Sequence, residues 1–194
     1  MDDITRISQT ILRERQGHDR GWWDQMRSCF AADATVRLSW FRGSGADFVA
    51  ASETMVARGE SSVHRLSPPV VDHHDDRAFV EIPAVIEVRS EVDGVETDLA
   101  SAARLCYRLR RHEGHWLIQS LDPVYERDTL IPSHPSQTLP IGPDDVAQFR
   151  PAYRFLSYVL SRRGYPVGDD LYGDDRPEAV ARFYQAAHEW LRAS

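Results

Sequence analysis

Residues 77–111, RAFVEIPAVIEVRSEVDGVETDLASAARLCYRLRR, decide the fold. On both sides of Asp93-Gly94, apolar residues alternate with polar ones, which is typical of strands with one buried face. An Asp-Gly pair between two such runs is a strong signal for a two-residue hairpin turn. The stretch therefore predicts two long antiparallel strands, in which Pro83 marks a bulge or an edge.

The segments around this hairpin extend the sheet and add helices. Further strands are predicted at 35–41, at 63–71 and, after a second tight turn at Glu113-Gly114, at 115–125. Helices are predicted from a cap at Asp2 or Asp3 through residue 12, at 19–30 after a turn between Gly17 and Gly21, and at 46–58, 144–163 and 177–191. Residues 126–142 are rich in Pro, Ser and Thr and are expected to form a linker or wrapping arm.

Helices beside an antiparallel meander of strands indicate an α+β fold. We expect residues 1–127 to form a cone-shaped α+β barrel domain, a curved antiparallel sheet wrapped around the N-terminal helices with a pocket inside. Residues 128–194 are expected to add a Pro-rich linker and a two-helix C-terminal extension.

Composition narrows the classes of function. A net charge of −7 argues against nucleic acid as a partner. All 23 basic residues are Arg, which excludes Schiff-base chemistry on a lysine. Cys29 and Cys106 have apolar neighbours and no metal-binding spacing, so buried thiols are expected. With neither a signal-peptide pattern nor a long apolar run, the chain is expected to be soluble and cytoplasmic, without a membrane partner.

Two residues are the main catalytic candidates. Asp24 lies in GWWDQM, early in the second predicted helix, and His64 lies at the start of the strand over 63–71. In an apolar pocket, a carboxylate can orient an imidazole and stabilise its protonated form, which makes the pair a general base at neutral pH. The histidines that fall in predicted loops and turns, and are not expected at the site, are His18, His73, His74, His112, His115 and His134.

Four stretches, 21–36, 63–78, 103–111 and 113–118, resemble in their order and spacing the nuclear transport factor 2-like superfamily, in particular its SnoaL-like branch. The resemblance covers about residues 3–127 and implies the cone-shaped fold. It also implies that Asp24 and His64 match the Asp/His pair of dehydratase and dehydrochlorinase members, in which the His removes a proton from carbon. The strand over 77–89 lacks the second histidine that scytalone dehydratase would place there.

Further candidates for substrate binding are Trp23, Trp40, Arg104, Tyr107, Trp116 and Asp122. The tryptophans would supply aromatic walls, and Arg104 or Tyr107 would stabilise an oxyanion. Each has a structural alternative, which is core packing for the aromatic residues, an outward face for Arg104 and a turn before Pro123 for Asp122.

We therefore expect an enzyme without cofactor or metal that abstracts a proton from a small apolar cyclic or polyketide-like substrate, as a dehydratase-type lyase, an isomerase or a cyclase. A cyclase would use Asp122 as its acid and base. The alternative is a non-catalytic ligand-binding or dimerising module of the same fold. A homodimer is expected, and the arginine-rich outer face of the strand over 98–111 could take part in its interface.

Overall fold

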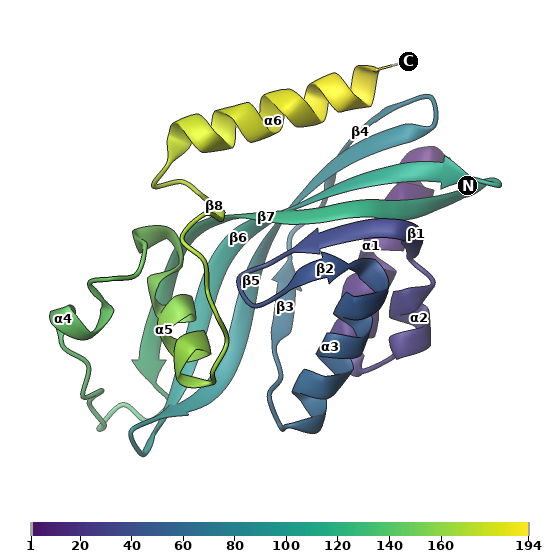
Figure 1. The fold of residues 1–194 in the computed structure, drawn as a ribbon. Coiled ribbons are helices and arrows are strands. Elements are labelled where there is room, and N and C mark those ends of the chain that lie inside the picture. The colour runs from purple at the N-terminus through teal and green to yellow at the C-terminus, as the bar shows by residue number, and fades with distance from the viewer. Residues whose placement is uncertain (1, 194) are drawn as a thin grey trace.

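The computed structural model describes residues 2–193 and centres on one curved, mixed sheet (Figure 1). Its strands follow the order β2-β1-β7-β6-β5-β3, with β4 added to β5 and β8 added to β7, and the path does not close into a barrel. The strands are β1 Phe30–Arg37, β2 Arg42–Ser44, β3 Val63–Leu66, β4 Val70–His74, β5 Arg77–Val92, β6 Val95–His112, β7 His115–Pro132 and β8 Tyr172–Gly173. The helices are α1 Asp3–Arg20, α2 Trp23–Arg27, α3 Gly45–Ala57, α4 Pro143–Val146, α5 Arg154–Arg162 and α6 Pro177–Arg192, with a 3-10 turn at Pro151–Tyr153.

The hairpin predicted at Asp93-Gly94 is confirmed. Strands β5 and β6 pair in an unbroken antiparallel register, and the two turn residues have φ of 49° and 81°, as this turn type requires. Pro83 makes no bulge in this ladder. Its carbonyl accepts a hydrogen bond from Ser67 N at 2.9 Å, just after β3 ends and before β4 begins. The missing N–H therefore faces a gap between two partner strands, where it costs no ladder hydrogen bond.

Several predictions about the fold need correction. The sheet is mixed rather than purely antiparallel, because β1 runs parallel to β7. Strand β7 continues to Pro132, so the boundary expected after residue 127 lies within a strand that is still paired with β6. The helix predicted over 144–163, for which the sequence left open that Pro151 kinks it or marks its true start, is interrupted at that proline, where the chain restarts as a 3-10 turn before α5.

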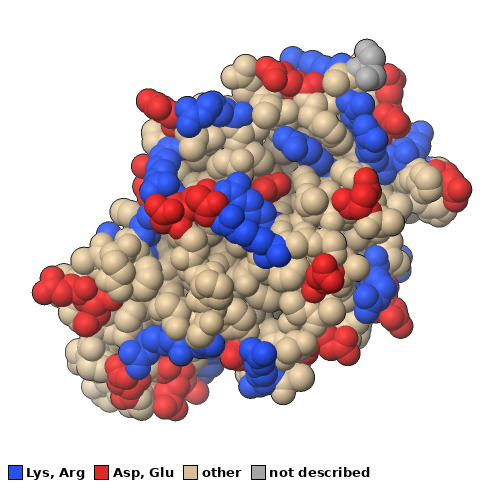
Figure 2. All heavy atoms as spheres, in the orientation of Figure 1, with Lys and Arg blue, Asp and Glu red and all other residues tan. Residues whose placement is uncertain are grey.

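The helices are divided between the two faces of the sheet. Helices α1, α2 and α3 lie on one side, here called the inner face, while α6 crosses the opposite, outer face (Figure 1). Helix α5 contacts the first half of β6 and the second half of β7. Its buried side chains share a core with inward-facing residues of both strands. On the side seen in Figure 2, Arg and acidic side chains are interspersed. Within residues 2–193, no helix combines the length and apolarity needed to cross a membrane.

Helix α1 is longer than predicted, and its additional turns contain residues of the candidate site. It runs through Gly17, where an added Cβ would lie 2.9 Å from the backbone nitrogen of Met26, so glycine is needed for the close approach of α2. It ends at Gly21, a left-handed cap with φ of 69°. Asp19 therefore belongs to the last turn of α1, and Asp24 lies beyond the cap in α2.

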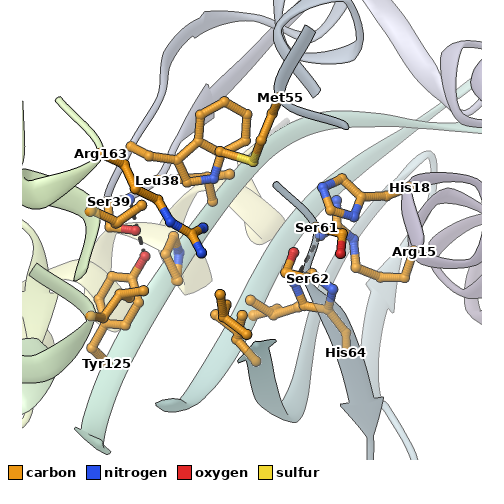
Figure 3. A pocket seen from close by; sticks show the side chains of 17 residues that line it. Arg15, His18, Leu38, Ser39, Met55, Ser61, Ser62, His64, Tyr125 and Arg163 are labelled. Atoms are coloured by element: carbon orange, nitrogen blue, oxygen red, sulfur yellow. Dashed lines mark hydrogen bonds between the residues drawn. The ribbon is translucent and has the colours of Figure 1, made fainter. Parts of the chain in front are cut away.

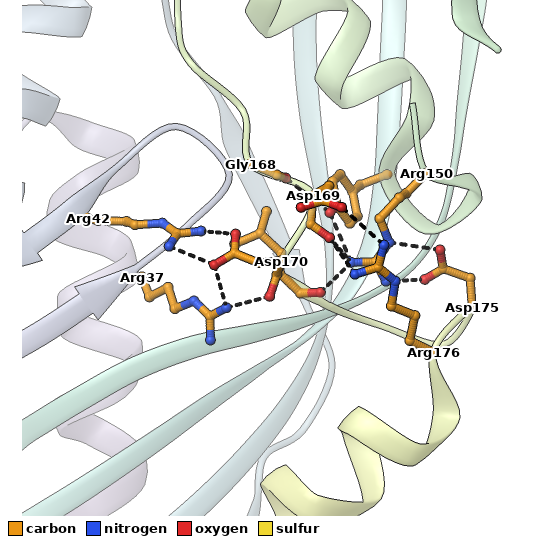
Figure 4. A network of polar contacts seen from close by, with 10 residues as sticks. Arg37, Arg42, Arg150, Gly168, Asp169, Asp170, Asp175 and Arg176 are labelled. Carbon is orange, nitrogen blue, oxygen red and sulfur yellow. Dashed lines mark hydrogen bonds and ion pairs between the residues drawn. The ribbon is translucent and has the colours of Figure 1, made fainter. Parts of the chain in front are cut away.

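The segment before α6 is held to the sheet by arginine–aspartate pairs (Figure 4). Asp170 pairs with Arg37 at the end of β1 and with Arg42 at the start of β2. Asp175 pairs with Arg150 at 2.6 Å. The pairs of Asp170 attach the C-terminal segment to β1 and β2, while the Arg150–Asp175 pair joins two parts of that segment to each other.

Candidate functional site

The inward face of α1 changes from apolar to charged along its length. Ile7 and Ile11 are fully buried in the core, and at the same four-residue spacing they are followed by Arg15 and Asp19. His18 is also buried, at the same end of the helix. The helix face that is apolar near the start of α1 thus places titratable side chains between the end of α1 and the sheet.

His64, on β3, is bound to the end of α1 through Asp19. Its ring Nδ1 lies 2.7 Å from Oδ1 of Asp19, and its backbone N–H donates to Oδ2 at 2.8 Å. Nδ1 of His18 lies 3.0 Å from the same Oδ1. Because an ionised carboxylate only accepts, both Nδ1 atoms carry a proton, and Nε2 of His64 keeps its lone pair. We call this arrangement the His64–Asp19 pair.

The carboxylate predicted to orient His64 was the wrong one. Asp24 is exposed on α2, and the hydrogen bonds of the His64 ring go to Asp19 and Arg15 instead. The prediction failed because Gly17 and Gly21 were interpreted as two ends of a turn, which placed Asp19 at the start of a new helix. His18, which had been assigned to a loop, is likewise part of α1 and of the site.

Burial and hydrogen bonding set the charges of the cluster. Burial lowers the pKa of His64, an effect only partly offset by the hydrogen bond that its ring donates to Asp19, so the ring is neutral at pH 7. Burial likewise lowers the pKa of His18 to about 4. For Asp19, burial favours the protonated form, but the hydrogen bonds from His18 and His64 outweigh it and hold the pKa below its usual range. The cluster therefore contains two neutral imidazoles around one carboxylate.

Arg15 places a cation beside the basic atom of His64. Its Nη1 lies 3.3 Å from Nε2 of His64. Its other nitrogens bind Glu14, with Nε 2.6 Å from one carboxylate oxygen, and the hydroxyl of Tyr107 donates to that same oxygen at 3.3 Å. Arg15 and Glu14 are both almost fully buried. The guanidinium is thus held in place and neutralised by a buried partner.

A pocket opens in front of these residues on the inner face of the sheet (Figure 3). It encloses about 610 Å³ of space free of protein atoms, its open mouth included. The hydroxyl of Tyr125 accepts a hydrogen bond from the backbone of Ser39 at 3.1 Å on the wall opposite the cluster. The apolar wall residues are Leu38, Trp40, Met55, Ile86, Val88, Leu105, Pro123, Leu156 and Leu160. This is a narrow, mainly apolar site with a few polar groups, as small-molecule sites are.

Of the six residues predicted to bind substrate, Trp40 lines this pocket. Trp23 packs against the core, and Trp116 is buried near the start of α1, where its indole N–H donates to Asp3 at 3.2 Å. Tyr107 is fully buried and binds Glu14 instead of facing the pocket. The core alternative therefore holds for these three aromatic residues.

Arg104 and Asp122 lie on the outer face, because they alternate with the pocket residues Leu105 and Pro123 along their strands. Arg104 binds Asp174 at 2.6 Å and the hydroxyl of Tyr184 in α6 at 3.0 Å. Neither can reach a substrate in the pocket, which removes the cyclase hypothesis based on Asp122. The arginine-rich face expected at a dimer interface is covered by α6 at Arg104, so the homodimer stays a prediction that needs another surface.

A metal could in principle use three of these side chains. His18, Asp19 and His64 bring one ligand atom each within 4.8 Å of one another. Both imidazoles, however, donate to one oxygen of Asp19 at hydrogen-bond distances, and the cationic Arg15 lies 3.3 Å from His64. A positive charge this close opposes a divalent cation. The arrangement therefore fits a hydrogen-bonded histidine–carboxylate cluster better than a metal centre.

Known proteins resemble this chain in sequence and in fold. Pea pathogenicity protein 2 of Fusarium vanettenii is 30% identical over 179 residues, which cover 87% of this chain and 77% of that protein. Two solved structures share the fold. One is a hexachlorocyclohexane dehydrochlorinase (LinA-type3) from Novosphingobium barchaimii, with a TM-score of 0.57, 15% identity and coverage of 71% of this chain and 94% of that one. The other is a scytalone dehydratase-like protein from Novosphingobium aromaticivorans, with a TM-score of 0.53, 17% identity and coverage of 72% and 93%. The SnoaL-like domain family matches residues 1–122, and the chain belongs to that family.

Proposed function

We propose that this protein is a cofactor-independent enzyme that removes a proton from a carbon atom of a small, largely apolar cyclic substrate, in a lyase- or isomerase-type reaction. The observation that carries the proposal is the hydrogen bond of 2.7 Å between Nδ1 of His64 and Asp19 at the wall of an apolar pocket. It leaves Nε2 as the basic atom. Two structural neighbours are named for eliminations, a dehydrochlorination and a dehydration, which supports the same class of reaction here.

His64 would act as the general base. Its lowered pKa keeps it neutral at pH 7, so it is ready to accept a proton without first losing one. In the reaction, the substrate C–H bond breaks, the proton goes to Nε2, and the electron pair forms a carbon–carbon double bond or an enolate. In an elimination, the leaving group departs with the electrons of its own bond. Asp19 then stabilises the imidazolium ion and keeps the ring in position.

Arg15 would stabilise the negative charge that this step creates. In the free protein its Nη1 donates to Nε2 at 3.3 Å. A bound substrate would displace this hydrogen bond, so that its C–H bond faces Nε2 and its neighbouring oxygen or leaving group accepts from Arg15 instead. Because Glu14 and Tyr107 hold Arg15 in place, little reorganisation is needed as the charge develops. The apolar walls would exclude water and so strengthen this interaction.

Exchange of carbon-bound protons with solvent tests the proposal without knowledge of the natural substrate. A panel of small cyclic ketones is incubated with the protein in D₂O, and deuterium uptake next to the carbonyl is followed by NMR. We expect exchange above the buffer rate with the native protein and none with His64→Gln. Asp24→Asn, which removes an exposed carboxylate five residues from Asp19, should behave like the native protein.

Exchange that persists unchanged in His64→Gln would show that His64 is not the base. Binding of the ketones without any catalysed exchange would instead favour the alternative, a ligand-binding module of the same fold.

A further inference from the structure

The C-terminal part of the chain supplies one wall of the pocket. Leu156 and Leu160 of α5 line it, together with Arg163, the residue that caps the end of this helix. These residues lie beyond 1–122, the part matched by the SnoaL-like domain family. The part of the chain matched by the family thus accounts for the inner cluster, while the C-terminal segment adds Leu156, Leu160 and Arg163 to the lining.

Helix α5 is fixed at both ends. At its start, the backbone N–H of Leu156 donates to Oδ2 of Asp128 on β7 at 2.7 Å. At its end, Arg162 forms an ion pair with Asp93 in the β5–β6 turn. Just before the helix, the ring of Tyr153 packs on Tyr125 with 5.1 Å between centroids. Arg163 therefore extends from a well-anchored element.

The side chain of Arg163 has no acidic partner, unlike Arg150, Arg162 and Arg176, which form ion pairs with aspartates. Arg163 donates one long hydrogen bond, 3.3 Å, to the carbonyl of Arg89, and within residues 2–193 no carboxylate lies within ion-pair distance of it. Its guanidinium extends from α5 toward the middle of the pocket (Figure 3).

The charges around the pocket do not neutralise this cation. The lining includes no Asp or Glu, and the other lining arginine, Arg15, is already paired with Glu14. The remaining titratable lining groups are two neutral imidazoles, His18 and His64, and the hydroxyl of Tyr125. A guanidinium in a largely apolar site is well suited to bind an anionic oxygen group, because its planar donors match a carboxylate.

We propose that Arg163 is a specificity-determining residue that binds a carboxylate of the substrate. The carboxylate would lie at the α5 side of the pocket and the apolar body against Trp40, which directs the reactive carbon toward His64 on the opposite side. This assignment rests on the proposed function for the reaction itself, but the binding of the anion can be tested separately. The substrate class is thus an apolar ring system with one carboxylate.

The test compares two probes of nearly equal shape, benzoate and its neutral analogue benzamide. Binding of each at pH 7 is measured by ligand-observed NMR for the native protein, for Arg163→Gln and for Arg182→Gln. We expect benzoate to bind at least about tenfold more tightly than benzamide to the native protein, as charge-assisted hydrogen bonds allow. Arg163→Gln should abolish this preference, while Arg182→Gln, which alters an exposed pair on α6, should retain it.

A native protein with no preference for benzoate, or a preference that survives in Arg163→Gln, would overturn the proposal. Arg163→Lys keeps the charge and should retain part of the preference, which separates lost charge from a general disturbance of α5. Ketone exchange that fails while the Arg163-dependent preference remains would overturn the proposed function alone, and the reverse result would overturn only this assignment.

Discussion

The two faces of the sheet carry similar polar residues in different settings. On the inner face, Arg15 pairs with Glu14, and their side chains are 3% and 0% exposed. On the outer face, Arg104 pairs with Asp174, and theirs are 19% and 47% exposed. Each arginine cluster includes a tyrosine, but only the inner one borders a pocket and two histidines. The comparison teaches that burial and free space, more than residue type, separate a candidate active site from a contact that attaches a helix.

The largest effect should come from breaking the His64–Asp19 pair. Asp19→Asn removes the negative charge that stabilises the imidazolium ion and can reverse the ring's tautomer. We expect the rate of ketone exchange to fall by about 10²–10⁴, the usual contribution of general base catalysis. Asp24→Asn is the matched control and should leave the rate unchanged. Equal rates for both variants would show that Asp19 contributes no more to the exchange reaction than the exposed Asp24 does.

The buried pair on the inner face should also be essential for stability. Glu14→Gln leaves Arg15 as a buried cation without its partner, which typically costs about 3–5 kcal/mol. Urea unfolding followed by tryptophan fluorescence measures this change in the free energy of unfolding. A loss below about 1 kcal/mol would mean that Arg15 escapes to solvent, and the contrast between the faces would then disappear.

Acid should destabilise the inner face through His18. Its pKa is about 4 in the folded protein and about 6.5 when unfolded, so the unfolded chain binds the proton more readily in between. Stability should therefore be fully present above about pH 6.5, decrease as the pH falls toward 4, and lose up to about 3 kcal/mol from this group. Urea unfolding at several pH values measures the slope. His18→Gln should flatten it, and an unchanged slope would contradict the assignment.

The smallest effect is expected on the outer face. Asp174→Asn weakens a half-exposed ion pair with Arg104, and such pairs contribute about 0–1 kcal/mol. The free energy of unfolding should change by less than about 1 kcal/mol, and ketone exchange should stay at the native rate. A loss as large as that for Glu14→Gln would show that the two clusters are equivalent in stability after all.

Much of the fold was predictable because its signals are local. Asp93-Gly94 and Glu113-Gly114 adopt the positive φ angles that their turns require, and the helix predicted over 46–58 is α3. The end of α1 was mispredicted because glycine inside a helix usually marks a break, whereas Gly17 is there for its contact with Met26. That contact is tertiary and has no mark in the local sequence.

The site was only partly predictable for the same reason. A signal for Asp19 did exist, since Ile7, Ile11, Arg15 and Asp19 follow one another at four-residue spacing on one helix face. No comparable signal existed for Arg163, whose place depends on how α5 packs against β6 and β7. The period of two along a strand does explain why Arg104 faces away from the pocket.

The position of α5 late in the sequence has a consequence for synthesis. The other residues that line the pocket, from Arg15 to Tyr125, precede α5 in the chain. Because chains emerge from the ribosome N-terminus first, the sheet and the His64–Asp19 pair can form while the wall from α5 is still missing. The nascent protein would then present an open apolar groove, bordered by Trp40 and Leu105, until α5 has emerged and closed it.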